Sequence, residues 1–222
     1  MTTLAMRKPH ADRGIEGMMA NWYAANTAEM MKDYVELAQR MATDVPQGSA
    51  VLEVAPGPGY FCIELAKRGS YAITGLDISH TMVKIAVKKA AEAGVNVGFQ
   101  QGSASSIPYP AASFDFLLCR AAFKNFARPV EALKEMHRVL KPGGRGLIID
   151  LKRNASPEEI SQGIDAMGLT WFNRTLTKLV FKGMLLRSAY TKEEFQQMLW
   201  EASFGNVEIN ENYMGFEIWM TK

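Results

Sequence analysis

Residues 51–60, VLEVAPGPGY, constrain the fold most, because an apolar segment runs directly into a turn that holds two prolines and two glycines. Proline and glycine interrupt regular structure, so the apolar segment is expected to be a short buried strand. A strand, a glycine-rich turn and a helix in this order are typical of doubly wound α/β folds, where ligands lie beyond the carboxyl ends of the strands. The stretch therefore predicts a ligand site at its turn.

Strand-like and helix-like segments alternate from residue 49 onward. We predict a seven-stranded, mostly parallel, doubly wound sheet with helices on both faces and an antiparallel last strand. The tail supplies the last two strands, at 206–210 and 214–221, joined by a short turn. The other predicted strands are 50–55, 71–77, 96–101, 114–119 and 146–151, and the predicted helices between them are 60–68, 81–93 and 129–140.

Two segments interrupt this alternation. Residues 14–43 precede the first strand and have a helical pattern, and residues 155–203 follow the fifth strand and are predicted to be helical throughout. Within the second segment, residues 156–159 (SPEE) and 191–194 (TKEE) are capping boxes that each predict a helix start.

The composition excludes several classes of function. A net charge of +2 gives no case for a nucleic-acid partner. The two cysteines, Cys62 and Cys119, lack metal-ligand spacing, and we expect no metal. The N-terminus lacks an apolar signal segment and no stretch of 18 apolar residues occurs, so we expect a cytoplasmic protein without stable membrane insertion. A homodimer is possible.

Acidic residues next to the turn limit what it can bind. A dinucleotide fingerprint needs a third glycine after Gly57 and Gly59, and it is missing here. Glu53 lies in the strand before the turn, where it would repel a pyrophosphate but could pair with an ammonium group. Asp77 ends the second strand, where a carboxylate can accept both hydroxyls of a ribose. The alternative is that Asp77 only caps the following helix.

These motifs resemble those of the class I S-adenosylmethionine-dependent methyltransferases, in the broad family that includes the ubiquinone and menaquinone C-methyltransferases. The resemblance extends from about residue 51 to residue 151. VLEVAPGPG is similar to the first motif, GLDIS to the second, and GSASSIPYPAASFDFLLC to the third and fourth. EALKEMHRVLKPGGRGLIID is similar to the helix, turn and fifth strand that follow.

The resemblance implies S-adenosylmethionine as the cofactor and assigns its contacts. Ala55 replaces the usual first glycine, which we expect to be a mild change, and Ser103 replaces the usual aspartate beside the adenine amine. Ser103 should therefore make a weaker contact. The implied cofactor residues are Glu53 at the methionine end, Ala55, Gly57 and Gly59 in the turn, Asp77 at the ribose, Ile78, Ser103 and Ala104 at the adenine, and Cys119 near the methyl group.

The resemblance also implies one domain over residues 1–222. We expect a helical lid at 1–46, a cofactor-binding core at 47–154, a helical cap insert at 155–190, and a C-terminal helix with a strand hairpin at 191–222. The insert carries a basic stripe, Arg174, Lys178 and Lys182. It could be a lid over an apolar aromatic substrate, neutral or anionic, a membrane-surface helix for a lipophilic quinone or lipid, or a packed helix with a solvated basic face.

The methyl acceptor is expected to be a small, apolar or aromatic molecule in a closed pocket, and its reacting atom stays open. No catalytic base is evident, and Tyr23, Arg120 and Lys124 are the candidates for catalysis. Lys124 could meet an anionic acceptor or be a solvated lysine on a short helix. The candidate substrate residues are Met19, Trp22, Tyr23, Arg120, Lys124 and Trp171. A non-catalytic module that binds S-adenosylmethionine is the alternative function, and a nicotinamide oxidoreductase is disfavoured.

Overall fold

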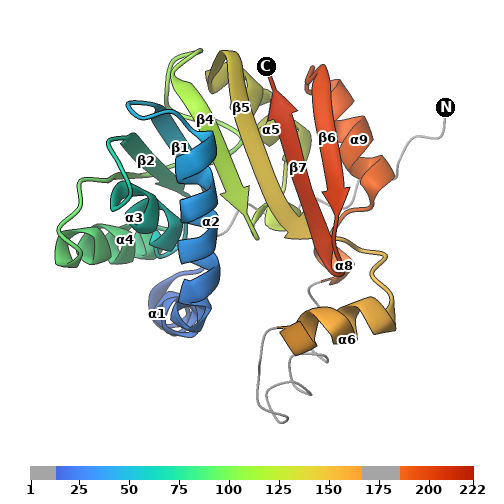
Figure 1. Cartoon of the computed structure of the whole chain (residues 1–222), viewed down its shortest axis with the longest axis horizontal. Coiled ribbons are helices and arrows are strands. Elements are labelled where there is room, and N and C mark those ends of the chain that lie inside the picture. The colour runs from blue at the N-terminus through green and yellow to red at the C-terminus, as the bar shows by residue number, and fades with distance from the viewer. Residues whose placement is uncertain (1–13, 167–185) are drawn as a thin grey trace.

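All seven predicted strands form a single sheet in the computed structural model, which describes residues 14–166 and 186–222 (Figure 1). The strand order is β3-β2-β1-β4-β5-β7-β6. Strands β1 to β5 pair in parallel, and β7 is antiparallel to both β5 and β6, so the predicted sheet is confirmed. The strands are β1 (Ala50–Val54), β2 (Ala72–Asp77), β3 (Gly98–Gln101), β4 (Phe114–Arg120), β5 (Leu140–Leu151), β6 (Asn206–Glu211) and β7 (Gly215–Thr221).

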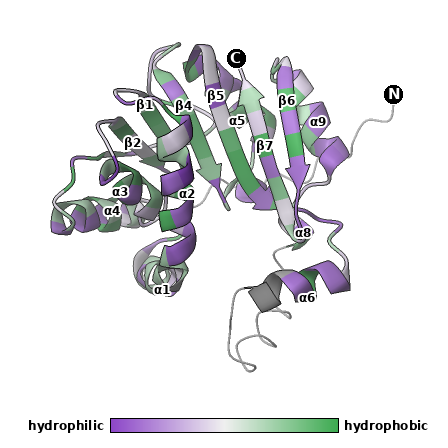
Figure 2. Ribbon diagram, in the orientation of Figure 1, coloured by the Kyte–Doolittle hydropathy of each residue, from purple (hydrophilic) through white to green (hydrophobic). Residues whose placement is uncertain are grey.

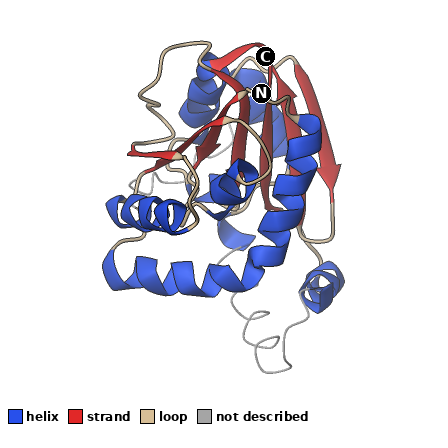
Figure 3. Ribbon diagram, turned by 60° about the vertical axis from the view of Figure 1, so that its left-hand side comes forward, coloured by secondary structure: helices blue, strands red, loops and turns tan. Residues whose placement is uncertain are grey.

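Helices cover both faces of the sheet (Figure 3). The helices α2 and α3 pack on one face and α5 and α9 on the other, while α1 and α6 lie beyond the edge where the parallel strands end (Figure 1). The helices are α1 (Gly17–Thr27), α2 (Met31–Asp44), α3 (Tyr60–Ala66), α4 (His80–Glu92), α5 (Pro129–Val139), α6 (Pro157–Ala166), α8 (Leu186–Ser188) and α9 (Lys192–Glu201), with short 3₁₀ turns η1 (Ala28–Met30) and η2 (Phe123–Asn125).

Alternate residues of the central strands enter two apolar layers, because successive side chains of a strand point to opposite faces. Leu52 and Leu117 face the layer under α5 and α9, and Val51 and Leu118 face the layer under α2 and α3. Figure 2 shows these strands as largely hydrophobic and the helices as two-sided. The sheet is therefore buried on both faces, as its nearly continuous apolar segments predict.

The segment 14–43 is helical as predicted and contains two helices, α1 and α2, separated by η1. Two predicted boundaries are wrong. The fifth strand starts at Leu140, six residues before the predicted start, and pairs there with Phe114 across a bulge. Residues 155–203 are not helical throughout, because Tyr190 forms a parallel bridge with Lys152. Both predicted capping boxes are present, with their reciprocal hydrogen bonds.

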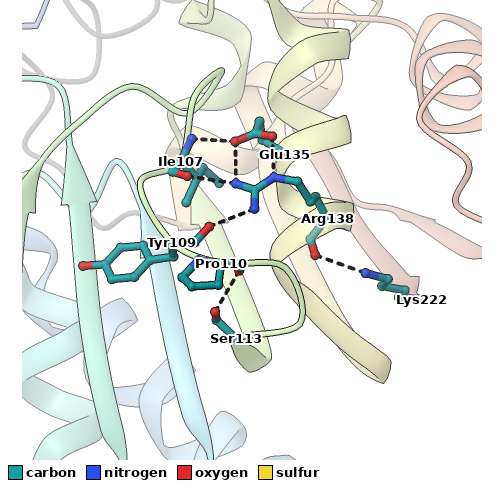
Figure 4. A network of polar contacts seen from close by, with 7 residues as sticks. All are labelled: Ile107, Tyr109, Pro110, Ser113, Glu135, Arg138 and Lys222. Atoms are coloured by element: carbon teal, nitrogen blue, oxygen red, sulfur yellow. Dashed lines mark hydrogen bonds and ion pairs between the residues drawn. The ribbon is translucent and has the colours of Figure 1, made fainter.

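The long connection between β3 and β4 is held to α5 by the side chain of Arg138 (Figure 4). Its guanidinium donates to the carbonyls of Ile107 and Tyr109 at 2.9 and 2.8 Å and to both carboxylate oxygens of Glu135. Glu135 in turn accepts the Ile107 N–H at 2.7 Å. This network fixes a loop whose first residues, Gly102, Ser103 and Ala104, line the cavity described below.

Candidate functional site

A cavity opens beyond the carboxyl ends of β1, β2 and β4, where the turn predicts a ligand site. Its floor comes from the last residues of these strands and the turns after them, and its cover comes from the segment before α1 and from α1 and α2. Lining residues are Gly14, Ile15, Tyr23, Tyr34, Glu53, Val54, Ala55, Pro56, Gly57, Pro58, Leu76, Asp77, Ile78, Met82, Gly102, Ser103, Ala104, Arg120, Ala121, Ala122, Asn125 and Phe126.

The turn after β1 contains three residues with positive φ. Ala55 has a φ of +57°, so replacing glycine by alanine here is not the mild change that we expected. Gly57, with a φ of +54°, faces the cavity, because an added Cβ would meet only Tyr23, at 3.9 Å. Gly59 has a different role: a Cβ there would lie 2.7 Å from the ring of Phe99, so Gly59 allows close packing rather than ligand contact.

Glu53 places a buried carboxyl group in the wall of the cavity. Its side chain lies on the α3 side of β1, and the Cys62 thiol of α3 donates a hydrogen bond to Oε2 at 2.9 Å. Burial raises the pKa of Glu53 to about 7, and the nearby Arg120 charge opposes that rise. A cationic ligand group beside Glu53 would favour its ionised form.

Asp77 fixes the turn and the start of α4 together. Its Oδ2 accepts the Gly57 N–H at 2.9 Å, and its Oδ1 accepts the Ser79 N–H at 2.8 Å. Burial raises the pKa of Asp77, and these two backbone donors oppose the rise. Helix α4 is capped by Ser79, whose Oγ accepts the Met82 N–H. Each Asp77 oxygen keeps a second lone pair for a ligand hydroxyl.

Three residues predicted near the adenine, Ile78, Ser103 and Ala104, line the cavity next to Asp77. The Ser103 hydroxyl accepts the Ser105 N–H at 3.2 Å. A neutral hydroxyl already used in this way is a weaker partner for an amine than a carboxylate would be.

An arginine and two tyrosines form the wall at the end of β4. The Arg120 guanidinium carbon lies 4.3 Å above the centre of the Tyr34 ring, and its Nη2 is 3.5 Å from Asp33 Oδ2. Burial raises the pKa of Tyr34 to about 12 and raises that of Tyr23 as well. Both phenols therefore keep their protons near neutral pH and can donate hydrogen bonds, but they are poor bases.

Lys124 is buried, which excludes its interpretation as a solvated lysine. Its Nζ lies 3.0 Å from Asp150 Oδ1 and donates to the carbonyl of Ala121. Asp150 Oδ2 accepts the Lys124 N–H at 2.9 Å. Lys124 is absent from the cavity lining, and its contacts hold the residues after Arg120 in place. The structure thus gives it a supporting position rather than one facing an acceptor.

Three other candidates from the sequence, Met19, Trp22 and Cys119, are absent from the cavity lining. Met19 and Trp22 are 66% and 64% exposed on α1, and only their neighbour Tyr23 points into the cavity. Cys119 is fully buried, and burial raises the pKa of its thiol well above the usual value. Trp171 and the basic stripe Arg174, Lys178 and Lys182 lie outside the described residues.

Sequence reasoning missed Tyr34, Ile15 and Cys62. Tyr34 and Ile15 line the cavity, and Cys62 contacts Glu53. Tyr34 reads as one more apolar position of a helix, and its contact with Arg120 depends on how α2 packs across the sheet. Of the three, only Cys62 could have been found from the sequence, because it lies nine residues after Glu53, in the helix that follows the turn.

The donor set fits a nucleoside that carries an ammonium group. Asp77 offers oxygens for ribose hydroxyls, buried Glu53 offers a carboxylate for a cation, and Gly57 leaves room for close approach. A pyrophosphate would face the two carboxylates instead of backbone donors, so the set does not fit a dinucleotide. Among the residues described, no group of three or more metal-ligating side chains is close enough to hold a metal, and no helix is long and apolar enough to cross a membrane.

Comparisons with known proteins find similarity to methyltransferases. Residues 52–148 match the model of a methyltransferase domain. A demethylmenaquinone methyltransferase of Deinococcus radiodurans is 42% identical over 107 residues, which are 48% of this chain and 44% of that protein. A ubiquinone/menaquinone biosynthesis C-methyltransferase of Francisella philomiragia is 27% identical over 75% of this chain and 70% of its own. The chain spans less than half the length of the first curated relatives that it matches.

The fold is shared with solved methyltransferases. A structure from Methanococcus maripaludis, described as a putative S-adenosyl-L-methionine-dependent methyltransferase, has a TM-score of 0.72 at 22% identity and covers 96% of both chains. The match over residues 52–148 and the shared fold lead to one conclusion. This part of the chain is similar to S-adenosylmethionine-dependent methyltransferases, and its relatives include ubiquinone and menaquinone C-methyltransferases.

Proposed function

We propose that this protein transfers a methyl group from S-adenosylmethionine to an ionisable, hydroxylated aromatic ring of the kind found in reduced quinones. The proposal rests on Arg120. It lines the cavity at the end of β4, its side chain is 15% exposed, and its carboxylate neighbour Asp33 is distant at 3.5 Å and largely solvated. An arginine whose carboxylate neighbour is distant and solvated can still form an ion pair with an anionic ligand. Relatives named for methylation of demethylmenaquinone support the choice of ring.

The cofactor end of the cavity is proposed to use the residues already described. Glu53 pairs with the ammonium group, Asp77 accepts the ribose hydroxyls, and Ile78, Ser103 and Ala104 border the adenine. When bound, S-adenosylmethionine supplies a methyl group whose bond to sulfur breaks with the electron pair left on sulfur. Positioning a nucleophile in line with that bond is then the main task of the protein.

The acceptor end of the cavity suits a substrate that is already anionic. Arg120 would hold the ring oxygen in its ionised form, and the electron-rich ring supplies the pair for the new bond from either that oxygen or a ring carbon. After attack from carbon, the hydrogen on that carbon leaves to water as a proton, which restores the aromatic ring. Tyr34 holds the guanidinium, and Tyr23 can donate a hydrogen bond. The cavity lining contains no histidine in the part of the chain described, which fits an acceptor that ionises without a strong base.

The proposed pocket can be closed only if other segments cover the acceptor end of the cavity. Tyr23 and Tyr34 belong to the predicted lid at residues 1–46, and both line the cavity, which supports that division of the chain. Trp171 falls within the predicted cap insert at 155–190 and lies outside the described residues.

The test uses a water-soluble reduced naphthoquinone as the acceptor, with release of S-adenosylhomocysteine as the readout. We expect turnover with this ring and none with its di-O-methyl ether, which has the same shape but cannot ionise. Arg120→Met should lower kcat/KM by about 100-fold, because one charge-stabilising group is removed. Its Kd for S-adenosylhomocysteine should stay within about threefold of wild type.

Two results would change the proposal. If Arg120→Met loses cofactor affinity instead of turnover, Arg120 contacts the cofactor and the anionic acceptor has no support. If wild type binds the cofactor but a panel of quinols, phenols, thiols and amines gives no product, the alternative of a non-catalytic S-adenosylmethionine-binding module is favoured.

A further inference from the structure

Residues 14–17, here called the strap, lie against the start of α4. The carbonyl of Ile15 accepts the Ser79 hydroxyl at 2.6 Å, and the Gly17 N–H donates to Thr81 Oγ1 at 3.1 Å. The backbone of Gly14 is so close to Ser79 that an added Cβ would lie 2.6 Å from the Ser79 Cβ. The strap is therefore seated on the helix by specific contacts rather than passing near it.

Glu16 makes the most concentrated contact between the strap and α4. Its Oε1 accepts the His80 N–H at 2.9 Å, and its Oε2 accepts the Thr81 N–H at 3.0 Å and the Thr81 hydroxyl at 2.5 Å. The first N–H groups of a helix lack partners within the helix and attract negative charge. The bonds from Thr81 hold the pKa of Glu16 below its usual value, so the carboxylate is ionised near neutral pH.

The position of the strap connects this contact to the cavity. Gly14 and Ile15 line the same end of the cavity as Asp77, Ile78 and Met82. Ser79 joins the two parts: its N–H donates to Asp77 Oδ1 and its hydroxyl donates to the strap. A nucleoside held by Asp77 would thus lie next to the strap.

We propose that Glu16 is a latch, a positioning residue that holds the strap over the nucleoside and limits the rate at which the cofactor and its product leave. The proposal rests on the proposed placement of the cofactor. Glu16 acts through α4 and touches no reacting atom. Its carboxylate contacts only backbone and hydroxyl donors among the described residues, so it stabilises the closed strap without contributing to the cavity wall.

The experiment measures the dissociation rate of S-adenosylhomocysteine from Glu16→Gln by stopped-flow displacement. We expect release about tenfold faster than from wild type, because charge-assisted hydrogen bonds are replaced by neutral ones. Glu92→Gln is the matched control. Glu92 ends the same helix, is solvent-exposed and pairs only loosely with Lys88, at 3.8 Å, so this variant should release product at the wild-type rate.

A second variant separates the latch from a general effect on folding. Thr81→Val removes the hydroxyl that donates to Glu16 while keeping a branched side chain, and it should also speed release. Combining it with Glu16→Gln should give less than the product of the two effects, because both remove the same contact. Wild-type release rates in both single variants, or equal acceleration in Glu92→Gln, would overturn the latch. Failure of wild type to bind S-adenosylhomocysteine would instead overturn the cofactor placement.

Discussion

Two alanines in the cavity wall, Ala55 and Ala121, have backbone φ angles of +57°. The left-handed region costs a residue with a Cβ roughly 1–2 kcal/mol, and such strain is found preferentially at ligand sites. Backbone hydrogen bonds to neighbouring strands impose this left-handed conformation on both alanines. The Ala55 N–H donates to the carbonyl of Leu76 at 2.8 Å, and the Ala121 N–H donates to that of Ile149 at 2.7 Å. The turns after β1 and β4 thus hold a fixed shape at the expense of stability.

Replacing Ala55 by glycine should relieve this strain. We expect Ala55→Gly to raise the free energy of unfolding by about 0.5–1 kcal/mol, since relief of the strain exceeds the added chain entropy of glycine. Urea denaturation measures the change. Ala91→Gly, at an exposed position in the last turn of helix α4, should lower the free energy of unfolding by up to about 1 kcal/mol. A loss of stability in Ala55→Gly comparable to that of Ala91→Gly would contradict the strained turn.

The buried carboxyl of Glu53 couples folding and binding to pH. Its pKa is about 7 in the folded chain, against an ordinary value of 4.5, so the folded protein favours the protonated form. The stability that this group contributes is present below pH 4.5 and is lost as the pH rises through about 7, a cost of about 3 kcal/mol. An ammonium ligand pairs with the ionised form, so its binding should strengthen over the same rise in pH.

Among the elements, η2 and β5 are joined by the buried pair of Lys124 and Asp150. Both side chains are at most 5% exposed. The pair also fixes Ala121, whose carbonyl accepts from Lys124 Nζ. Since Ala121 follows Arg120 directly, the pair supports the wall on which the acceptor proposal depends.

Removing one member of this pair should be costly. We expect Lys124→Met to lower the free energy of unfolding by about 3–5 kcal/mol, because Asp150 is left buried without its countercharge. Lys141→Met is the comparison: its pair with Asp115 has a similar distance, 2.8 Å, but the two side chains are 41% and 37% exposed. That variant should cost less than about 1 kcal/mol. Equal losses in chemical denaturation would show that the buried pair has no special role.

At the scale of the whole molecule, the sequence predicts the sheet well and the contacts between distant segments around the cavity poorly. Alternating apolar segments determine which residues form strands and that both faces are covered, and these patterns are local. The burial of Lys124, the positive φ of Ala55 and the seating of Glu16 on α4 depend on contacts between distant segments. No pattern within a short window records such contacts. The residues at the strand ends that line the cavity can therefore be predicted from the sequence, and the contacts that support them cannot.

The same limit explains which site residues could be predicted. Glu53, Gly57 and Asp77 follow from motifs at the ends of strands, and all three line the cavity. Gly59 has the same sequence signature but serves packing against Phe99, a distinction that depends on tertiary neighbours. Tyr34 contributes through the packing of α2, which leaves no motif.

The most direct test of the account is calorimetric titration with S-adenosylhomocysteine at pH 6 and pH 8, for wild type and for Glu53→Gln. We predict micromolar binding to wild type that is up to about tenfold tighter at pH 8, because Glu53 is ionised there. Glu53→Gln should bind more weakly and lose most of the pH dependence. Absence of micromolar binding to wild type, or the same affinities and pH dependence in both proteins, would contradict the claim that this cavity holds the cofactor through Glu53.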